Sequence, residues 1–357
     1  MAPSQLVLVS GGAGYIGSHT IIELLVAGHR VLCLDNYSNS DATVFEHIRT
    51  IVGDSGFSRL QTVECDIACS ATFDRAVMDI PVPNWIIHFA AFKNVGESGR
   101  QPFEYYYNNL VGFLNMLRYA KDSGCRNFMF SSSATVYSHE ATLPYREIGG
   151  GAGALDGRYG TIRNAAHPYG NTKVVCEQIL HDMVAASAAV PWNVVILRYF
   201  NPVGCHASGL IGDSFKQGRA NNLFPAILGA VAADEELSVF GADYTETADG
   251  TPARDYIHVV DLALAHVVAL TCQSLGGPAE KRPRCYNVGL GHAYTVGEVL
   301  AEFRLQGLKV RSRTVARRPG DAAVSYCDPA AIQSDLGWRP QFGLADMVRD
   351  TLRFFRR

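Results

Sequence analysis

A tyrosine and a lysine four residues apart could carry out acid–base chemistry in this chain. Tyr169 and Lys173 lie in the string His-Pro-Tyr-Gly-Asn-Thr-Lys, and on a helix this spacing places them on one face. A free phenol has a pKa of about 10, whereas a general base needs a pKa near the working pH. Lowering the phenol pKa to the working pH takes roughly 4 kcal/mol. A positive charge about 4 Å away, at an effective dielectric of about 20, supplies about that much. Lys173 could be that charge. The same spacing also fits an ordinary Tyr and Lys on a helix surface, so the catalytic interpretation requires a nicotinamide site elsewhere in the chain.

A glycine-rich turn near the N-terminus predicts such a site. Leu6–Val9 is an apolar run of buried-strand type and leads into Gly11–Gly17, a helical pattern that stops at Gly28, and a second strand that ends in Asp35. The glycines allow a tight turn and close approach of a pyrophosphate to the helix N-terminus. The acid can bind ribose hydroxyls and repel a 2′-phosphate, which favours NAD over NADP. An oxidised nicotinamide would place a second positive charge near Tyr169.

Strands and helices continue to alternate along the first 200 residues. Apolar runs predict strands at 60–64, 85–89, 127–130 and 193–199, and helical patterns cover 102–123 and 168–186. This alternation predicts an α/β fold, a Rossmann-type doubly wound parallel sheet, with ligands at the carboxyl ends of its strands. The glycine turn, Phe89–Lys93, Ser131–Ser133 and Phe200–Gly204 all follow strands and are expected on one rim.

The second half of the chain is less regular and predicts a smaller mixed α/β substrate lobe. We expect the NAD-binding domain to span residues 1–200, with strand and helix contributions from about 237–272, and the lobe to comprise 201–236 and 273–357. The segments 237–240 and 285–288 look like isolated strands, and 259–271 and 296–304 look like helices. Gly149–Gly157, within a Gly-rich insertion near 149–165, is expected to be a mobile loop.

Composition and charge exclude several function classes. The chain has 357 residues, of which 48% are hydrophobic and 18% charged, so a large core is expected. A net charge of −3 provides no basic surface for nucleic acid or a membrane. Apolar runs are too short to span a bilayer, and the N-terminus lacks a signal-peptide pattern. A cytoplasmic location is therefore predicted.

The cysteines support a reducing compartment. The nine cysteines are scattered and form no Cys-x-x-Cys pair, which fits a reduced cytosolic protein better than a disulfide framework or a zinc site. Cys65 and Cys69 flank Asp66 and could suggest a metal, but no metal site is predicted.

Ser133 completes a possible catalytic group. Alone it could be a turn residue or a helix cap, but at a strand end before the Tyr-bearing helix its hydroxyl could share a substrate proton with Tyr169. The Gly-x-x-Gly-x-x-Gly turn, Ser133 and Tyr-x-x-x-Lys together resemble the short-chain dehydrogenase/reductase superfamily. The chain length is similar to that of its extended branch, which acts on nucleotide sugars.

Longer strings resemble the UDP-glucose/UDP-galactose 4-epimerase family. The resemblance extends from about Val7 to Pro340. It is carried by Gly14–Thr20, Asp35–Ser40, Val95–Ser98, Ser131–Tyr137, Arg198–Gly204 and Arg254–Val259.

The resemblance implies a mechanism and a set of contacts. Tyr169 would remove the proton of the sugar 4-hydroxyl, Lys173 would lower the pKa of Tyr169 and hold the nicotinamide ribose, and Ser133 would bind the 4-oxygen. A homodimer through the helices at 102–123 and 168–186 is also implied. With the glycine turn, the implied NAD contacts are Gly11, Gly14, Tyr15, Ile16, Gly17, Asp35, Asn36, Ser38, Asn39, Ser40, Asp66, Ile67, Phe89, Ala90, Ala91, Lys93, Asn108, Ser131, Tyr169, Lys173 and Phe200. The implied UDP-sugar contacts are Lys93, Ser133, Tyr169, Asn201, Asn222, Leu223, Arg254, Arg318, Asp321 and Ser325.

Two departures from the family and two rival functions stay open. The stretch between Tyr145 and Tyr169 is about ten residues longer than the family's, and Pro319 stands where Glu is common. A nucleotide-sugar 4,6-dehydratase or decarboxylase would need a carboxyl group next to Ser133, where Ala134 and Thr135 stand. A non-enzymatic NAD-binding regulator would not need the three catalytic residues.

Residue 325 bears on substrate range. If the stretch after Asp321 is extended, Asp321 and Ser325 face the same way because strand side chains alternate. Relatives resembling this chain carry either a bulky Tyr or a small residue there, and the bulky form is associated with rejecting 2-N-acetyl sugars. The small Ser325 predicts turnover of UDP-GlcNAc and UDP-GalNAc as well, unless Tyr326 or the long loop fills the space.

Overall fold

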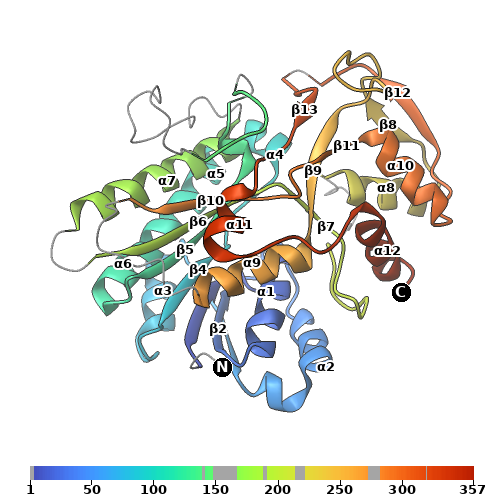
Figure 1. Ribbon diagram of the computed structural model, residues 1–357. Helices are drawn as coiled ribbons and strands as arrows, with labels where there is room; N and C mark the ends of the chain where they lie inside the picture. The colour runs from blue at the N-terminus through green and yellow to red at the C-terminus, as the bar shows by residue number, and fades with distance from the viewer. Residues whose placement is uncertain are drawn as a thin grey trace.

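A seven-stranded parallel sheet forms the centre of the computed structural model, which describes residues 4–138, 141–147, 167–187, 191–213, 222–271, 282–318 and 320–357 (Figure 1). The strand order is β10-β6-β5-β4-β1-β2-β3, so the chain reverses direction across the sheet between β1 and β4. The predicted doubly wound sheet is confirmed. The strands are β1 (Leu6–Ser10), β2 (Arg30–Asp35), β3 (Leu60–Glu64), β4 (Trp85–His88), β5 (Asn127–Ser133), β6 (Asn193–Tyr199) and β10 (Arg284–Val288).

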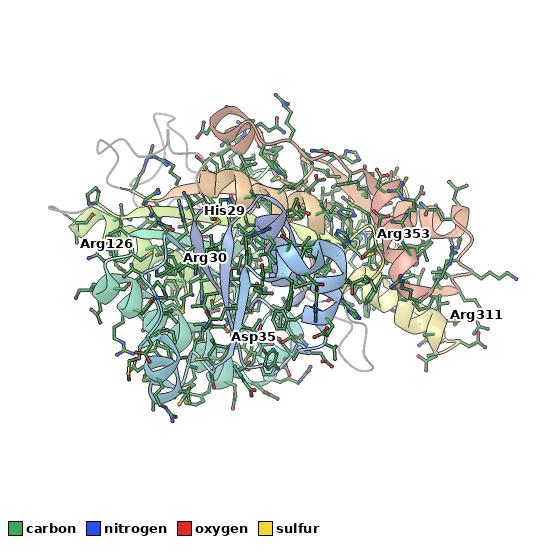
Figure 2. All side chains as sticks on the ribbon, turned by 90° about the horizontal axis from the view of Figure 1, so that it is seen from below. His29, Arg30, Asp35, Arg126, Arg311 and Arg353 are labelled. Atoms are coloured by element: carbon green, nitrogen blue, oxygen red, sulfur yellow. The ribbon has the colours of Figure 1, made fainter. Side chains whose placement is uncertain are left out.

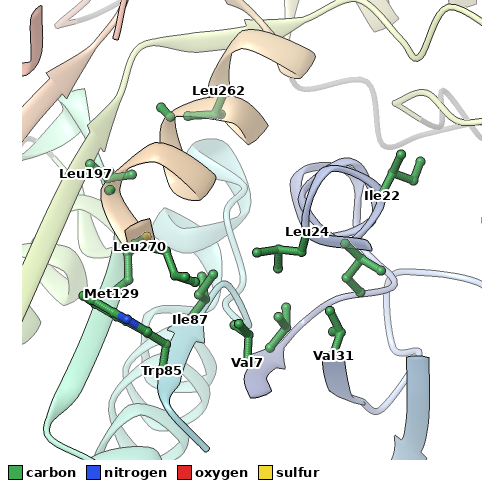
Figure 3. Close-up of a cluster of buried hydrophobic side chains, with 14 of the residues drawn as sticks. Val7, Ile22, Leu24, Val31, Trp85, Ile87, Met129, Leu197, Leu262 and Leu270 are labelled. Carbon is green, nitrogen blue, oxygen red and sulfur yellow. The ribbon is translucent and has the colours of Figure 1, made fainter. Parts of the chain in front are cut away.

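Helices cover both faces of this sheet. One layer consists of α1 (Tyr15–Val26), α2 (Val44–Phe57), α9 (Val259–Thr271) and α11 (Ala330–Leu336), and the other of α3 (Ser70–Val77), α6 (Gly112–Ser123) and α7 (Pro168–Ala186). Figure 3 shows Leu24 of α1 directed toward Val7 and Ile87, and Leu262 of α9 on the side of Leu197. None of the helices in the described segments combines the length and apolarity needed to span a bilayer.

The helical stretch predicted at 102–123 is interrupted. It consists of α5 (Pro102–Tyr106), a π-helical segment η1 (Tyr107–Val111) and α6, preceded by the short helix α4 (Val95–Arg100). Periodicity does not distinguish these segments because a single wide turn shifts the apolar face only slightly. Such π segments occur frequently at functional sites, and this one contains Asn108 and Asn109.

The remaining strands and helices build the lobe seen on the right of Figure 1. β9 is paired with β7, β11 and β13, and β8 is paired with β12. These elements pack with three helices around a separate apolar cluster. They are β7 (Asn201–Val203), β8 (Leu237–Phe240), β9 (Ala253–His258), β11 (Ala293–Thr295), β12 (Ser312–Val315), β13 (Val324–Ser325), α8 (Leu223–Ala232), α10 (Val296–Leu305) and α12 (Leu344–Phe355).

Three strands lie on the other side of the expected domain boundary. β8 and β9 were predicted within the NAD-binding part, but both pair within the lobe, and β10 was predicted in the lobe but is the edge strand of the large sheet. Neither β8 nor β10 is isolated, since each pairs in parallel with a distant strand. The pattern of apolar residues identifies a strand but not the neighbour that satisfies its backbone hydrogen bonds. The Gly-rich stretch at 149–157 lies outside the described residues.

Gly204 directly follows β7 and has a conformation that disfavours side chains. Its φ is +88°, and a Cβ at this position would lie 2.6 Å from Nε2 of the buried His258 ring. Gly124, after α6, has a similar φ of +82° but open space around the same position. The two glycines therefore differ mainly in steric surroundings.

We predict that Gly204→Ala destabilises the protein more than Gly124→Ala. The left-handed conformation costs an Ala about 1–2 kcal/mol at either site, and displacement of the His258 ring adds about 1–3 kcal/mol at Gly204 alone. Thermal or urea unfolding of both variants measures the difference. Equal destabilisation would show that the His258 contact imposes no constraint.

Candidate active site

The glycine turn after β1 forms a cradle at the point where the strand order reverses. Gly11 has a φ of +75°, and a Cβ there would lie 2.6 Å from the backbone nitrogen of Ala90, at the end of β4. A Cβ at Gly17 would collide with the Gly11 carbonyl, whereas one at Gly14 would meet only that oxygen, at 3.4 Å. Gly11 and Gly17 thus close the turn, and the open side at Gly14 fits the approach of a pyrophosphate.

The first turn of α1 presents unoccupied donors to this cradle. Its N-cap is Gly14, no side chain caps the helix, and no acidic residue lies in its first turn. The N-terminus of a helix favours negative charge through these donors and the helix dipole. The arrangement fits the diphosphate of a dinucleotide.

Asp35 lies at the end of β2 and is held by three hydrogen bonds. One carboxylate oxygen accepts the Ala13 N–H at 2.9 Å, and the other accepts the Tyr37 N–H at 2.9 Å and the Ser40 hydroxyl at 3.0 Å. A carboxylate can accept about four such bonds, so one site remains for a ribose hydroxyl. The following residues, Asn36, Ser38 and Asn39, are exposed, and Figure 2 shows Asp35 in the sheet-containing half of the molecule.

Other predicted NAD contacts line the same rim. The hydroxyl of Tyr15 donates to the Gly204 carbonyl at 2.7 Å, and the Lys93 ammonium lies 5.8 Å from the Tyr15 ring centre. Ile16, Phe89, Ala90, Ala91 and Asn108 are half-buried, Ile67 is buried and Asp66 is exposed. The structure therefore brings residues from the ends of β1, β3 and β4 and from η1 to one edge of the sheet.

Phe200 does not reach this rim with its side chain. The side chain is 1% exposed and packs in a cluster with Tyr137 and Tyr145, while its backbone N–H donates to Val288. Phe200 does follow the end of β6, as predicted. The direction of its side chain depends on the twist of β6 and on the residues that pack beneath that strand. Only the backbone of Phe200 is left as a cofactor contact.

Three successive serines at the end of β5 face three successive turns of α7. The Lys173 ammonium donates to the Ser131 carbonyl at 2.6 Å. Ser132 donates to the carboxylate of Glu177, and Ser133 hydrogen-bonds the hydroxyl of Tyr169. The predicted catalytic residues Ser133, Tyr169 and Lys173 are thus brought together.

The start of α7 positions Tyr169. His167 is the N-cap, and its Nδ1 accepts the Gly170 N–H at 3.0 Å, while Pro168 occupies the first turn as expected. The His167 ring lies parallel to that of Tyr169, with 5.9 Å between centroids. This cap and stacking fix the helix start and thereby the direction of the phenol.

The pKa of Tyr169 differs from the expectation. Burial raises it to about 12, and the hydrogen bond from Ser133 lowers it only in part. The Lys173 ammonium donates to the Ser131 carbonyl and lies 4.8 Å from the centroid of the Phe130 ring, and burial is the larger influence on the pKa of the phenol. Burial lowers the pKa of Lys173 itself to about 8. Activation of the phenol therefore needs further positive charge close to it.

Asn109 and Thr135 are further site residues that the sequence did not reveal. Asn109 is buried, its side chain bonds both backbone groups of Phe92, and it donates to the Thr172 hydroxyl at 3.1 Å. Thr135 donates to the Ser133 hydroxyl at 3.0 Å, which leaves the Ser133 proton free to point toward Tyr169. A polar residue in an apolar helix face was the available signal for Asn109, but no spacing identified its partners.

The predicted sugar-nucleotide residues of the lobe gather around β9. Ser325 pairs in register with Arg254, and the Arg254 guanidinium forms an ion pair with Asp321. Asn201, on the adjacent β7, donates to the Asp255 carbonyl at 2.7 Å. Tyr145 also belongs to this group, because its hydroxyl hydrogen-bonds Ser325. Burial raises the pKa of Tyr145.

The other three predicted contacts belong to neighbouring elements. Asn222 is the N-cap of α8 but makes no side-chain capping bond, and Leu223 is the first residue of that helix. The guanidinium of Arg318 stacks on Phe240, 3.8 Å from the ring centroid. The Arg318 carbonyl accepts the backbone N–H of Asp321 at 3.2 Å, which joins Arg318 to the β9 group. Pro319 lies outside the described residues.

Comparison with known proteins identifies the family. Residues 7–289 match the NAD dependent epimerase/dehydratase family. The chain belongs to that family. It is 41% identical over 350 residues to the UDP-glucose 4-epimerase of Pasteurella multocida (strain Pm70), covering 97% of this chain and 96% of that protein.

Two solved structures show the same fold. One is the UDP-glucose 4-epimerase of Stenotrophomonas maltophila with bound NAD and formylated UDP-arabinopyranose (TM-score 0.86, 40% identity, covering 99% of this chain and 98% of the other). The second is the UDP-glucose 4-epimerase of Bifidobacterium longum in complex with NAD+ and UDP (TM-score 0.84, 38% identity, 98% and 97% covered). Membership of the family makes this chain an NAD-dependent enzyme, as the glycine turn and Asp35 predicted.

Proposed function

We propose that the chain is a UDP-glucose 4-epimerase that interconverts UDP-galactose and UDP-glucose, and so acts in galactose and nucleotide-sugar metabolism. The observation that carries this proposal is the meeting of Ser133, Tyr169 and Lys173 at the end of β5, beside the glycine cradle. The near full-length similarity to UDP-glucose 4-epimerases supports it.

NAD would be held along the rim of the sheet. The cradle at Gly11–Gly17 would take the diphosphate, Asp35 a ribose, and Asp66 and Ile67 the adenine, while Lys173 would hold the nicotinamide ribose. When bound, NAD accepts hydride from carbon 4 of the sugar and returns it. Since hydride must return to the opposite face for epimerisation, the sugar has to turn over between the two events.

Tyr169 and Ser133 handle the proton on the sugar 4-oxygen. Tyr169 removes the proton as the 4-keto sugar forms and gives it back afterwards. Ser133 accepts from Thr135 and can donate to the phenol or to the 4-oxygen. Because burial holds the pKa of Tyr169 at about 12, the base is effective only when positive charge, from the oxidised cofactor and Lys173, stabilises the phenolate.

The lobe would bind the UDP moiety. Arg254 and Arg318 suit the diphosphate because guanidinium groups match phosphate oxygens. Asp321, Asn201, Asn222, Leu223 and Lys93 are the other proposed sugar-nucleotide contacts. Arg254 and Asp321 form an ion pair, which holds the two proposed contacts next to each other.

The alternative reactions lack a necessary group. Ala134 and Thr135 follow Ser133, and the Thr135 hydroxyl is engaged with Ser133, so these two positions provide no carboxyl group for elimination. A non-enzymatic regulator leaves the contacts among Ser133, Tyr169 and Lys173 unexplained. Turnover of UDP-galactose without added NAD separates epimerisation from both alternatives.

The first catalytic prediction concerns Tyr169→Phe. The variant should keep its fold and bound NAD but lose about 10²–10⁴-fold in kcat, because general-base catalysis contributes that much. Tyr119→Phe is a matched control, since Tyr119 packs on Phe73 far from the site. Near-normal turnover of Tyr169→Phe would remove this residue from the mechanism.

We also propose that N-acetylated UDP-sugars are substrates. Ser325 is small, half-buried and opposite Arg254 on β9, where it would line the sugar pocket. Its hydroxyl partner Tyr145 stacks on Tyr137, with 4.8 Å between centroids, which holds the Tyr145 ring in one position next to Ser325. The small side chain supports the wider range, because a bulky residue at this position would take space that a 2-N-acetyl group needs.

The measurement compares UDP-GlcNAc/UDP-GalNAc with UDP-glucose/UDP-galactose on the native protein and on Ser325→Tyr. The native protein should turn over both pairs, and the bulkier variant should lose mainly the N-acetyl pair. The idea fails if the native protein rejects N-acetyl sugars or if the Tyr variant keeps them.

A homodimer is proposed for the face formed by α5, η1 and α6. Phe103, Tyr107 and Leu114 are 72%, 53% and 48% exposed on these consecutive segments, and the first two rings stack on each other at 6.1 Å. Apolar side chains grouped in this way are typical of a protein–protein interface. The location proposed for the enzyme is the cytoplasm, which suits its free cysteines, buried for the most part.

Phe103→Glu should shift the protein from dimer to monomer, because it places a charge in the proposed apolar interface. Met78→Glu is the control, since Met78 is 70% exposed after α3 and away from this face. Sedimentation velocity reports both masses. A dimer that is equally stable in both variants argues against this interface.

A further inference from the structure

Glu177 extends the row of catalytic residues on α7 by one turn. Tyr169, Lys173 and Glu177 follow one another at intervals of four residues, so they share one face of the helix. Each bonds a different serine at the end of β5: Tyr169 bonds Ser133, Lys173 bonds the Ser131 carbonyl, and Glu177 accepts the Ser132 hydroxyl. The first two contacts belong to the proposed reaction, whereas the third has no chemical role in it.

The carboxylate of Glu177 is fully buried and fully engaged. Its side chain is 0% exposed and forms an ion pair with Arg198, which is 1% exposed on β6. Two N–H groups of the guanidinium donate to the two carboxylate oxygens, at 2.6 Å and 3.1 Å. Ser132 and Arg198 are register partners in the sheet, so Glu177 binds β5 and β6 at one level.

Arg198 connects this pair to the segment that precedes the insertion. It donates to the Tyr137 hydroxyl at 2.9 Å, and Tyr137 donates to the Asn287 side chain at 2.7 Å. Asn287 in turn donates to the Tyr145 carbonyl at 2.9 Å. The network therefore joins α7, β5, β6 and β10 with the backbone next to the sugar pocket.

Such a network is not explained by stability alone. Replacing a buried ion pair with apolar residues of similar volume is often neutral or stabilising, whereas removing one partner is strongly destabilising. A rigid bidentate pair does fix the position of the elements that carry it. Here those elements carry Tyr169 and Lys173 on one side and Ser131 and Ser133 on the other.

We propose that Glu177 is a positioning residue for the reaction: by binding Ser132 and Arg198 it sets the third turn of α7 against β5, and so places Tyr169 and Lys173 against Ser133 and Ser131. The inference rests on the proposed epimerase function. A displacement of about 1 Å in such a group can cost about 10²-fold in rate.

Glu177 also influences the charge of Lys173. Burial lowers the pKa of Lys173 to about 8, and the Cys176 and Glu177 side chains on α7 act in the opposite direction. From the sheet, the neutral His88 on β4 and the charged Arg198 on β6 face the same interior. Removal of the Glu177 charge would leave Arg198 unbalanced and lower the pKa of Lys173 further.

The test compares Glu177→Gln with two other variants. Asp261→Asn is the matched control, because Asp261 is also 0% exposed and accepts the N–H groups of Gln341 and Phe342, far from the site. Ser132→Ala removes one bond to Glu177 and keeps the ion pair. We would measure kcat and KM across pH, the melting temperature, and the titration of Lys173 by NMR of ¹³Cε-labelled lysine, one of six lysines in the chain.

Glu177→Gln should lower kcat by about 10²-fold while KM changes little. Its Lys173 resonance should titrate about one pH unit below that of the native protein, and the alkaline limb of the kcat profile should move the same way. Ser132→Ala should lower kcat less, without moving the titration. Asp261→Asn should lower only the melting temperature.

The inference is overturned if Glu177→Gln keeps native kcat and Lys173 titration, or if Asp261→Asn reproduces its kinetic changes. If Glu177→Gln does not fold, Ser132→Ala decides: reduced kcat at unchanged KM supports the inference, and native kcat overturns it. Absence of epimerisation in the native protein would refute the proposed function instead, and the Lys173 titration would still test the effect of Glu177.

Discussion

The reversal of strand order between β1 and β4 is the constraint on which the functional features depend. Right-handed crossovers that advance in one direction place all their helices on one face of a parallel sheet, so covering both faces requires the direction of winding to change once. At that point the segments leaving β1 and β4 diverge and leave a crevice. The two segments are close only where they leave the strands, where a Cβ at Gly11 would lie 2.6 Å from the Ala90 nitrogen.

Burial of charge determines how the catalytic group works. Lys173 and Glu177 are 3% and 0% exposed, and both are enclosed by the packing of α7 on β5 and β6. Desolvation lowers the pKa of Lys173 to about 8 and raises that of Tyr169 to about 12. Burial therefore makes Tyr169 a weaker base catalyst than an exposed tyrosine would be. Activation of the phenol then depends on a positive charge bound next to it.

In the lobe, a buried carboxylate on β9 positions the proposed sugar-nucleotide contacts. Arg254 and Asp255 are adjacent, so one side chain faces the sugar-nucleotide group and the other faces the interior. Asp255 is buried, and its carboxylate accepts N–H groups from Leu290, Gly291 and Cys327. Burial raises the pKa of Asp255 to about 6, which these bonds partly oppose. The carboxylate thereby fixes two loops beside the strand that carries Arg254.

The sequence by itself determined the local chemistry and most element types. The glycine turn, Asp35 and the Tyr-x-x-x-Lys spacing depend on residue type and short separation, and α7, β6 and α9 begin and end where the patterns predicted. The alternation of elements also determined the doubly wound sheet, because few topologies satisfy it.

Only the tertiary structure decided the pairings between distant segments. The assignment of β8 and β10, the inward packing of Phe200, the direction of the Lys173 ammonium and the Glu177–Arg198 pair all depend on neighbours far away in the chain. A strand pattern does not name its partner, and a pKa depends on burial that no spacing encodes. The physical reason is common to all four: hydrogen bonding and desolvation act through space, whereas sequence patterns record only separation along the chain.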